Sequence, residues 1–96
     1  MPSYLVETFL ARGRTGELSA CEQRARSAAE ELTQEKVRVR FERVIHLPED
    51  EICFFVFDAP SGREAARAAQ RAGLDPFRVI EAVSSGEEGV TRSNPE

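Results

Sequence analysis

The groups in this chain that are best suited to chemistry are a single histidine and a carboxylate inside an apolar run. Glu7 interrupts the apolar stretch from Tyr4 to Leu10, where a carboxylate is costly unless it is paired or solvated. His46 precedes a turn, and histidine is the residue type most often used as a proton carrier or ligand near neutral pH. Both residues are therefore candidates for a proton carrier or a ligand contact. The structural alternatives are an interface ion pair for Glu7 and a surface or half-buried position without a catalytic task for His46.

Three arginines form a second candidate feature. Arg38, Arg40 and Arg43 recur along one segment, and guanidinium groups match the geometry of carboxylates and phosphates. The pattern predicts either an anion-binding strip or an edge strand whose charges prevent aggregation. Together with Glu7 and His46, these arginines make up the candidate ligand-binding residues.

The two cysteines are interpreted as structural. Cys21 and Cys53 are too far apart for a C-x-x-C motif, and an unpaired cysteine packs as a small hydrophobe. No neighbour in the sequence of Cys53 would activate its thiol. The chain also contains no Gly-rich phosphate loop, no nucleophile elbow and no metal-ligand cluster. Catalytic residues stay unknown, no metal ligand is assigned, and the residues favour a binding protein over an enzyme.

Length and composition restrict the class of protein. The chain has 96 residues, 41% of them hydrophobic, and a formal net charge of −4. This size favours one domain, and the negative charge argues against a nucleic-acid surface. No run approaches the roughly 18 apolar residues of a membrane span, and the N-terminal segment does not resemble a signal peptide. We expect a cytoplasmic protein without a membrane partner.

Hydrophobic periodicity predicts the elements of the first half. Residues 3–10 are typical of a strand, and Thr15 is a predicted N-cap for a helix whose apolar stripe continues to Leu32. Residues 37–42 alternate between apolar and polar, as in a half-exposed strand, and a bulge or bend is expected at Val44 and Ile45. A turn at 47–50 then leads to residues 51–58, which lack alternation and predict a central strand buried on both faces.

The second half repeats the pattern with a shorter helix. Ser61 and Glu64 form a predicted capping box, and Gly73 is expected to end the helix that follows. A last strand is predicted over 77–84. Residues 85–96 have little apolar content, so the predicted organisation is a domain at 1–84 and a flexible tail at 85–96.

This order of elements predicts an α+β fold, the ferredoxin-like βαββαβ sandwich. Its four-stranded antiparallel sheet has strand order 4-1-3-2, with both helices on one face. The other face is left open although the central strands carry apolar residues on both sides. A second copy of the chain would cover it most simply, so we expect a homodimer. A charged Glu7 would be costly against the helices, so we place it on the open face, near Arg38, Arg40 or Glu42.

Several segments together carry a resemblance to a known family. They are Pro2-x-Tyr4-Leu5-Val6-Glu7, Phe41-Glu42, Leu47-Pro48-Glu49-Asp50-Glu51-Ile52-Cys53-Phe54, Ala59-Pro60-Ser61 and Arg71-Ala72-Gly73. Over about residues 2–84 the chain resembles a family of small ferredoxin-like domains, of actinobacterial type, that includes a nickel-binding protein. The resemblance implies a dimer and, in that member, histidines that hold nickel. The matching positions here are Thr8, Phe9 and Arg43, so the nickel-ligand histidines are missing.

Three functional hypotheses follow. The first is a dimeric, metal-responsive or small-ligand-binding module, with nickel disfavoured because one histidine cannot build such a site. The second is a small dimeric enzyme that uses Glu7 or His46 as a proton carrier. The third is an accessory domain that binds another protein. Convergence of Glu7 and His46 in one pocket would favour the enzyme, and a paired Glu7 would favour a structural role.

Overall fold

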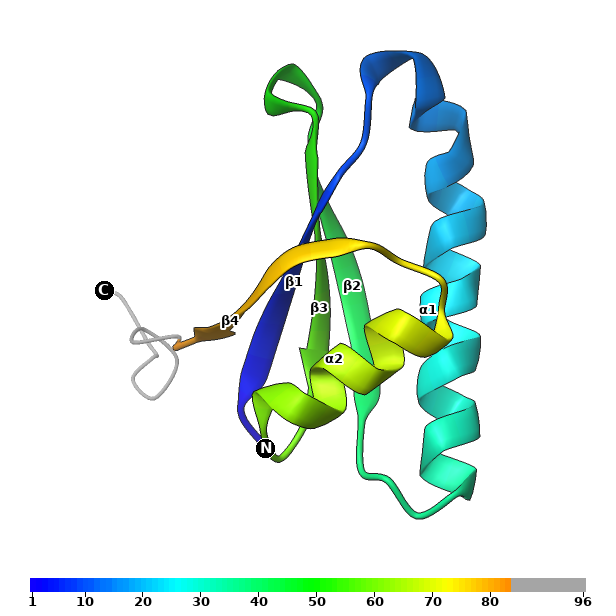
Figure 1. Ribbon diagram of the computed structural model, residues 1–96, viewed down its shortest axis with the longest axis vertical. Coiled ribbons are helices and arrows are strands. Elements are labelled where there is room, and N and C mark those ends of the chain that lie inside the picture. The colour runs from blue at the N-terminus through cyan, green and yellow to red at the C-terminus, as the bar shows by residue number, and fades with distance from the viewer. Residues whose placement is uncertain (84–96) are drawn as a thin grey trace, which may run out of the picture.

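The computed structural model describes residues 1–83 and has the element order βαββαβ (Figure 1). The sheet order is β2-β3-β1-β4, with all neighbours antiparallel, which confirms the predicted ferredoxin-like α+β fold. The predicted tail at 85–96 lies outside the described residues. The elements are β1 (Ser3–Phe9), η1 (Arg12–Glu17), α1 (Leu18–Gln34), β2 (Arg40–Leu47), η2 (Pro48–Asp50), β3 (Ile52–Asp58), α2 (Gly62–Arg71) and β4 (Pro76–Ala82).

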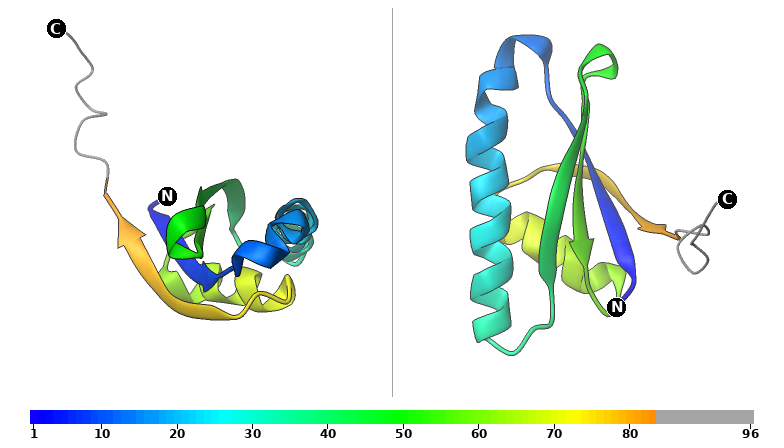
Figure 2. Two further views of the ribbon diagram at one scale, coloured as in Figure 1. Left: turned by 90° about the horizontal axis from the view of Figure 1, so that it is seen from above. Right: turned by 180° about the vertical axis from the view of Figure 1, so that it is seen from behind.

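Both helices lie on the same face of the sheet (Figure 2). Val6, Phe55 and Phe57 point from the central strands towards them and are almost fully buried. Most of the helix residues that pack against these side chains are alanines, which lets the helices lie close to the sheet. Their buried positions are Ala25, Ala28, Ala29 and Leu32 in α1, and Ala65, Ala68 and Ala69 in α2. Among residues 1–83, no helix is both long enough and apolar enough to cross a membrane.

The helix ends agree with the sequence in one case and differ in the other. Ser61 caps α2 as predicted, because its Oγ accepts a hydrogen bond from the Arg63 amide at 3.3 Å. Gly73 has φ +77°, the left-handed conformation that ends this helix. The prediction for Thr15 was wrong: it lies inside η1, where its hydroxyl donates to the Arg12 carbonyl, and α1 begins only at Leu18.

Two β-bulges decide which face each side chain occupies. In β2, Glu42 is the extra residue between the pairs of Phe41 and Arg43 with β3, so the bulge expected at 44–45 was placed too late. In β4, Phe77 is the extra residue opposite the step from Glu7 to Thr8. A bulge changes the alternation of the residues that follow it. Residues 43–47 therefore alternate again, in a register that the sequence pattern did not reveal.

Candidate functional site

The face of the sheet opposite the helices, here called the open face, consists of four cross-strand rows. Side chains of paired residues in an antiparallel sheet point to the same side, so the register assigns each row. The rows are Phe9–Ile52–Leu47, then Arg78–Glu7–Phe54–Ile45, then Ile80–Leu5–Val56–Arg43, and finally Ala82–Ser3–Asp58–Arg40. The first row is entirely apolar and its outer members, Phe9 and Leu47, are exposed. The last row is polar, so the open face changes in character along the strands.

Glu7 lies on the open face as the sequence predicts, but its partner is a different residue. The Nε atom of Arg78 donates to Glu7 Oε1 at 2.7 Å across the β1–β4 pair. Glu7 is only 9% exposed, whereas the Arg78 side chain is 68% exposed. Glu7 therefore lies on a central strand of the sheet, and Arg78 of the neighbouring strand β4 supplies the positive charge that pairs with it. Neither Arg38 nor Arg40 supplies this charge.

His46 points to the other face. It is paired with Cys53, which is 1% exposed and belongs to the core beneath the helices. Its Nε2 atom is buried and has no hydrogen-bond partner within the described residues. Because Glu7 and His46 lie on opposite faces, the structure does not bring them together in one pocket.

Two of the three candidate arginines, Arg40 and Arg43, occupy neighbouring rows of the open face on β2. Arg38 precedes β2 and is exposed, whereas Arg43 lies on the open face opposite Val56. Arg40 is occupied by two carboxylates, because its Nη2 lies 2.7 Å from both Asp58 Oδ2 and Glu42 Oε2. Arg40 is therefore already paired with carboxylates, and Arg38 lies outside the rows of the sheet.

Asp58 is the buried member of this polar row. It is 7% exposed, and Ser3 Oγ donates to its Oδ1 at 2.8 Å. Burial alone would raise the pKa of Asp58, but hydrogen bonding with Glu42, Ser3 and Arg40, together with the Arg40 charge, outweighs burial and lowers that pKa. These contacts join β2, β3 and β1 at one end of the sheet.

The positions at which the expected resemblance would place nickel ligands do not suit nickel. Thr8 donates its hydroxyl to the Cys53 carbonyl at 3.4 Å, Phe9 has no donor atom, and Arg43 carries a positive charge. Nickel sites in proteins favour imidazole and other neutral or anionic donors. Within residues 1–83, no group of three or more histidine, cysteine or acidic side chains is arranged to hold a metal ion.

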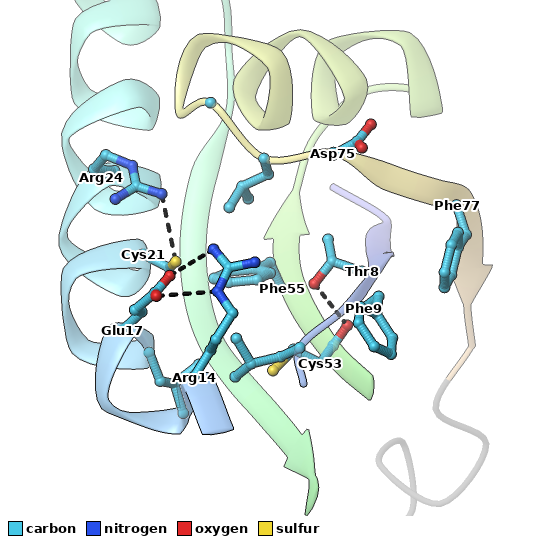
Figure 3. A pocket seen from close by; sticks show the side chains of 14 residues that line it. Thr8, Phe9, Arg14, Glu17, Cys21, Arg24, Cys53, Phe55, Asp75 and Phe77 are labelled. Carbon is cyan, nitrogen blue, oxygen red and sulfur yellow. Dashed lines mark hydrogen bonds and ion pairs between the residues drawn. The ribbon is translucent and has the colours of Figure 1, made fainter. Parts of the chain in front are cut away.

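A cavity of about 380 Å³ is the feature that the sequence did not reveal. Four segments that are distant in the chain form it: the end of β1, the stretch from η1 into α1, the strand β3, and the stretch from the end of α2 into β4 (Figure 3). Its size lies within the range of small-molecule sites in proteins. Arg14 and Glu17 lie at its edge and form an ion pair of 2.7 Å. Their i,i+3 spacing was the only sequence signal, and it is common on exposed helices.

Both cysteines line this cavity, but their environments differ. Cys53 is buried, and burial raises the pKa of its thiol. Cys21 is partly exposed, and Arg24 Nη2 donates to its Sγ at 3.4 Å. Arg24 is itself held by its Nε, which donates to the Ala72 carbonyl at the end of α2 at 2.9 Å. The cavity thus contains an accessible thiol beside an anchored guanidinium.

The chain matches no family model, no curated protein and no solved structure.

Proposed function

We propose that this protein is a homodimeric, non-catalytic module for a small ligand, whose two copies pack through their open faces. The observation that carries the proposal is the apolar character of this face on all four strands. Leu5, Ile45, Phe54 and Ile80 are only half-buried within one chain, and Phe9 and Leu47 are 55% and 39% exposed. Burying such surface is favourable by about 25 cal/mol per Å². A large apolar face on a small domain is typical of an interface.

Charge complementarity favours a second copy as the occupant. A two-fold axis brings the same surface of both chains together, so a charge at the centre meets either itself or its partner residue. Glu7 and Arg78 lie side by side in one row, so each copy offers one negative and one positive group. Glu7 of one copy can then face Arg78 of the other. A partner whose surface carried only positive or only negative groups would leave either Arg78 or Glu7 without an opposite charge.

The same geometry supports binding rather than catalysis. Glu7 already has a cationic partner, and His46 lies on the opposite face. The proposal therefore assigns Glu7 a structural role and places the small ligand in the cavity between helices and sheet, separate from the dimer contact. Nickel is not the proposed ligand. The cytoplasm is the proposed compartment, because both cysteines are free thiols.

Light scattering after gel filtration tests the dimer. The expected mass is twice the 10.7 kDa of one chain. Ile45→Lys would place a charge among the apolar residues on the β2 side of the open face and is expected to yield a monomer. Ser27→Lys is the matched control, since Ser27 is exposed on α1 and should leave the dimer intact. A wild-type monomer at concentrations of about 100 μM, or a dimer that tolerates Ile45→Lys, would refute the proposed interface.

A further inference from the structure

We infer that the cavity beside Cys21 binds a small carboxylic acid with an apolar body. This inference rests on the ligand-binding part of the proposed function and specifies the chemical class of the ligand. Three observations carry it: the composition of the cavity floor, an excess of positive charge on one side, and donor atoms of that side that are still available.

The floor of the cavity is apolar. Phe55 and Cys53 contribute from the central strand β3, and Leu18 and Leu74 close the sides from α1 and from the α2–β4 connection. Phe9 and Phe77 stand on the β1–β4 side (Figure 3). Phe77 is 65% exposed and is the extra residue of the β4 bulge, a position that redirects a side chain. An aliphatic or aromatic body of a few carbons would cover this surface.

The opposite side of the cavity carries one positive charge in excess. Two guanidinium groups, Arg14 and Arg24, face one carboxylate, Glu17. Asp75 lies across the cavity from them (Figure 3). Over the whole lining the charges balance, because Arg14 and Arg24 stand against Glu17 and Asp75. The positive charge is therefore confined to the Arg14–Arg24 side, where a guanidinium can bind a ligand carboxylate through paired hydrogen bonds.

Donor atoms remain for that carboxylate. Arg14 uses Nε and Nη2 for Glu17, and Arg24 uses Nε for the Ala72 carbonyl and Nη2 for Cys21. The Nη1 atoms of both arginines have no hydrogen-bond partner within residues 1–83. Arg24 is already held by the end of α2, so little side-chain freedom is lost when the ligand binds. The ligand carboxylate is therefore assigned to Arg24, with Arg14 as the second contact.

Calorimetric titration of the full chain with hexanoate tests the inference. Hexanoate is expected to bind with a dissociation constant of about 0.1–1 mM, as befits a ligand of this size. Hexanamide, which lacks the charge, and acetate, which lacks the apolar body, are expected to bind about tenfold more weakly. Bound hexanoate should also slow alkylation of Cys21 by iodoacetamide, because Cys21 lines the same cavity.

Variants assign the binding to Arg24. Arg24→Gln is expected to weaken hexanoate about tenfold, and Arg24→Lys to recover part of the loss because it keeps the charge. Arg67→Gln is the matched control, since Arg67 is exposed on α2 and does not line the cavity. Circular dichroism of each variant establishes that it is folded.

The outcomes separate this inference from the proposed function. Equal binding of hexanoate and hexanamide, or equal affinity of Arg24→Gln and Arg67→Gln, overturns the carboxylate assignment and leaves a ligand site for neutral molecules. Failure of all three probes to bind or to protect Cys21 overturns both the assignment and the ligand-binding module. Light scattering reports on the dimer independently, so a monomer that binds hexanoate refutes only the open-face interface.

Discussion

The two faces of the sheet contain similar apolar side chains but differ in how these are matched. On the helix face, Phe57 is fully buried and meets Phe41 edge to face, with ring centroids 5.5 Å apart. On the open face, Phe54 is only half-buried, and its neighbour Glu7 is an acidic residue paired with Arg78. Apolar residues alone therefore do not distinguish a buried core from an open face. The two faces differ in how much apolar side-chain surface stays exposed within one chain. They also differ in whether charged residues are present and paired.

Alanine substitutions on the two faces should produce the largest contrast. Phe57→Ala leaves a cavity in the core and is expected to lower the free energy of unfolding by about 3–5 kcal/mol. Phe54→Ala removes less buried surface within one chain and should cost about 1–2 kcal/mol. Chemical denaturation at several protein concentrations measures both. Only the effect of Phe54→Ala should depend on concentration, because only Phe54 belongs to the proposed interface. A concentration-independent loss for Phe54→Ala would contradict the dimer.

The ion pair at the centre of the open face provides the next contrast. Arg78→Gln removes the charge partner of a carboxylate that is 9% exposed. The expected loss of unfolding free energy is about 1–2 kcal/mol, because Glu7 is left buried without its cation. Glu7→Gln combined with Arg78→Gln should recover part of that loss. Recovery in the double variant distinguishes a compensating pair from two independent surface residues, for which the effects would add.

The sequence was sufficient for the topology because the topology depends on periodicity and turn residues. The apolar run of β1, the uninterrupted apolar β3 and the Ser61 cap are local signals, and the structure confirms them. The positions of the bulges at Glu42 and Phe77 are not local, because they depend on how neighbouring strands align.

The candidate residues also divide into features that local sequence predicts and features that depend on contacts between distant segments. Glu7 was placed on the correct face because a charge is costly against the core, but its partner Arg78 lies 71 residues away in the sequence. The sequence contains other arginines that fit such a role equally well, so nothing local selects Arg78. The cavity was missed for a related reason: η1 replaces the first turn predicted for α1, and this 3-10 helix carries Arg14 to the cavity edge.

Asp58 offers a pH-dependent test of the polar end of the open face. The pKa of Asp58 in the folded chain lies below its ordinary value, so its stabilising contribution is present above the unfolded pKa of about 3.9 and is lost as the pH falls through the folded pKa. Asp58→Asn is expected to cost about 1 kcal/mol at pH 7. The difference between wild type and Asp58→Asn should shrink as the pH is lowered below about 4. Urea denaturation at pH 7, 5 and about 3 measures this, and a difference that stays constant would contradict the assigned hydrogen bonds.

The two thiols differ in exposure, although both line the cavity. Cys53 is buried in the core, and Cys21 is partly exposed. Burial raises the pKa of Cys53 and its side chain is 1% exposed, so its thiolate is scarce and inaccessible in the folded chain. Cys21 is partly exposed beside Arg24. Iodoacetamide at pH 8 should therefore modify Cys21 first, and mass spectrometry should show a single addition until the chain unfolds. Cys21→Ser is the control, since it should leave the native protein unmodified. Early modification of Cys53 would mean that the helix face opens far more readily than its packing indicates.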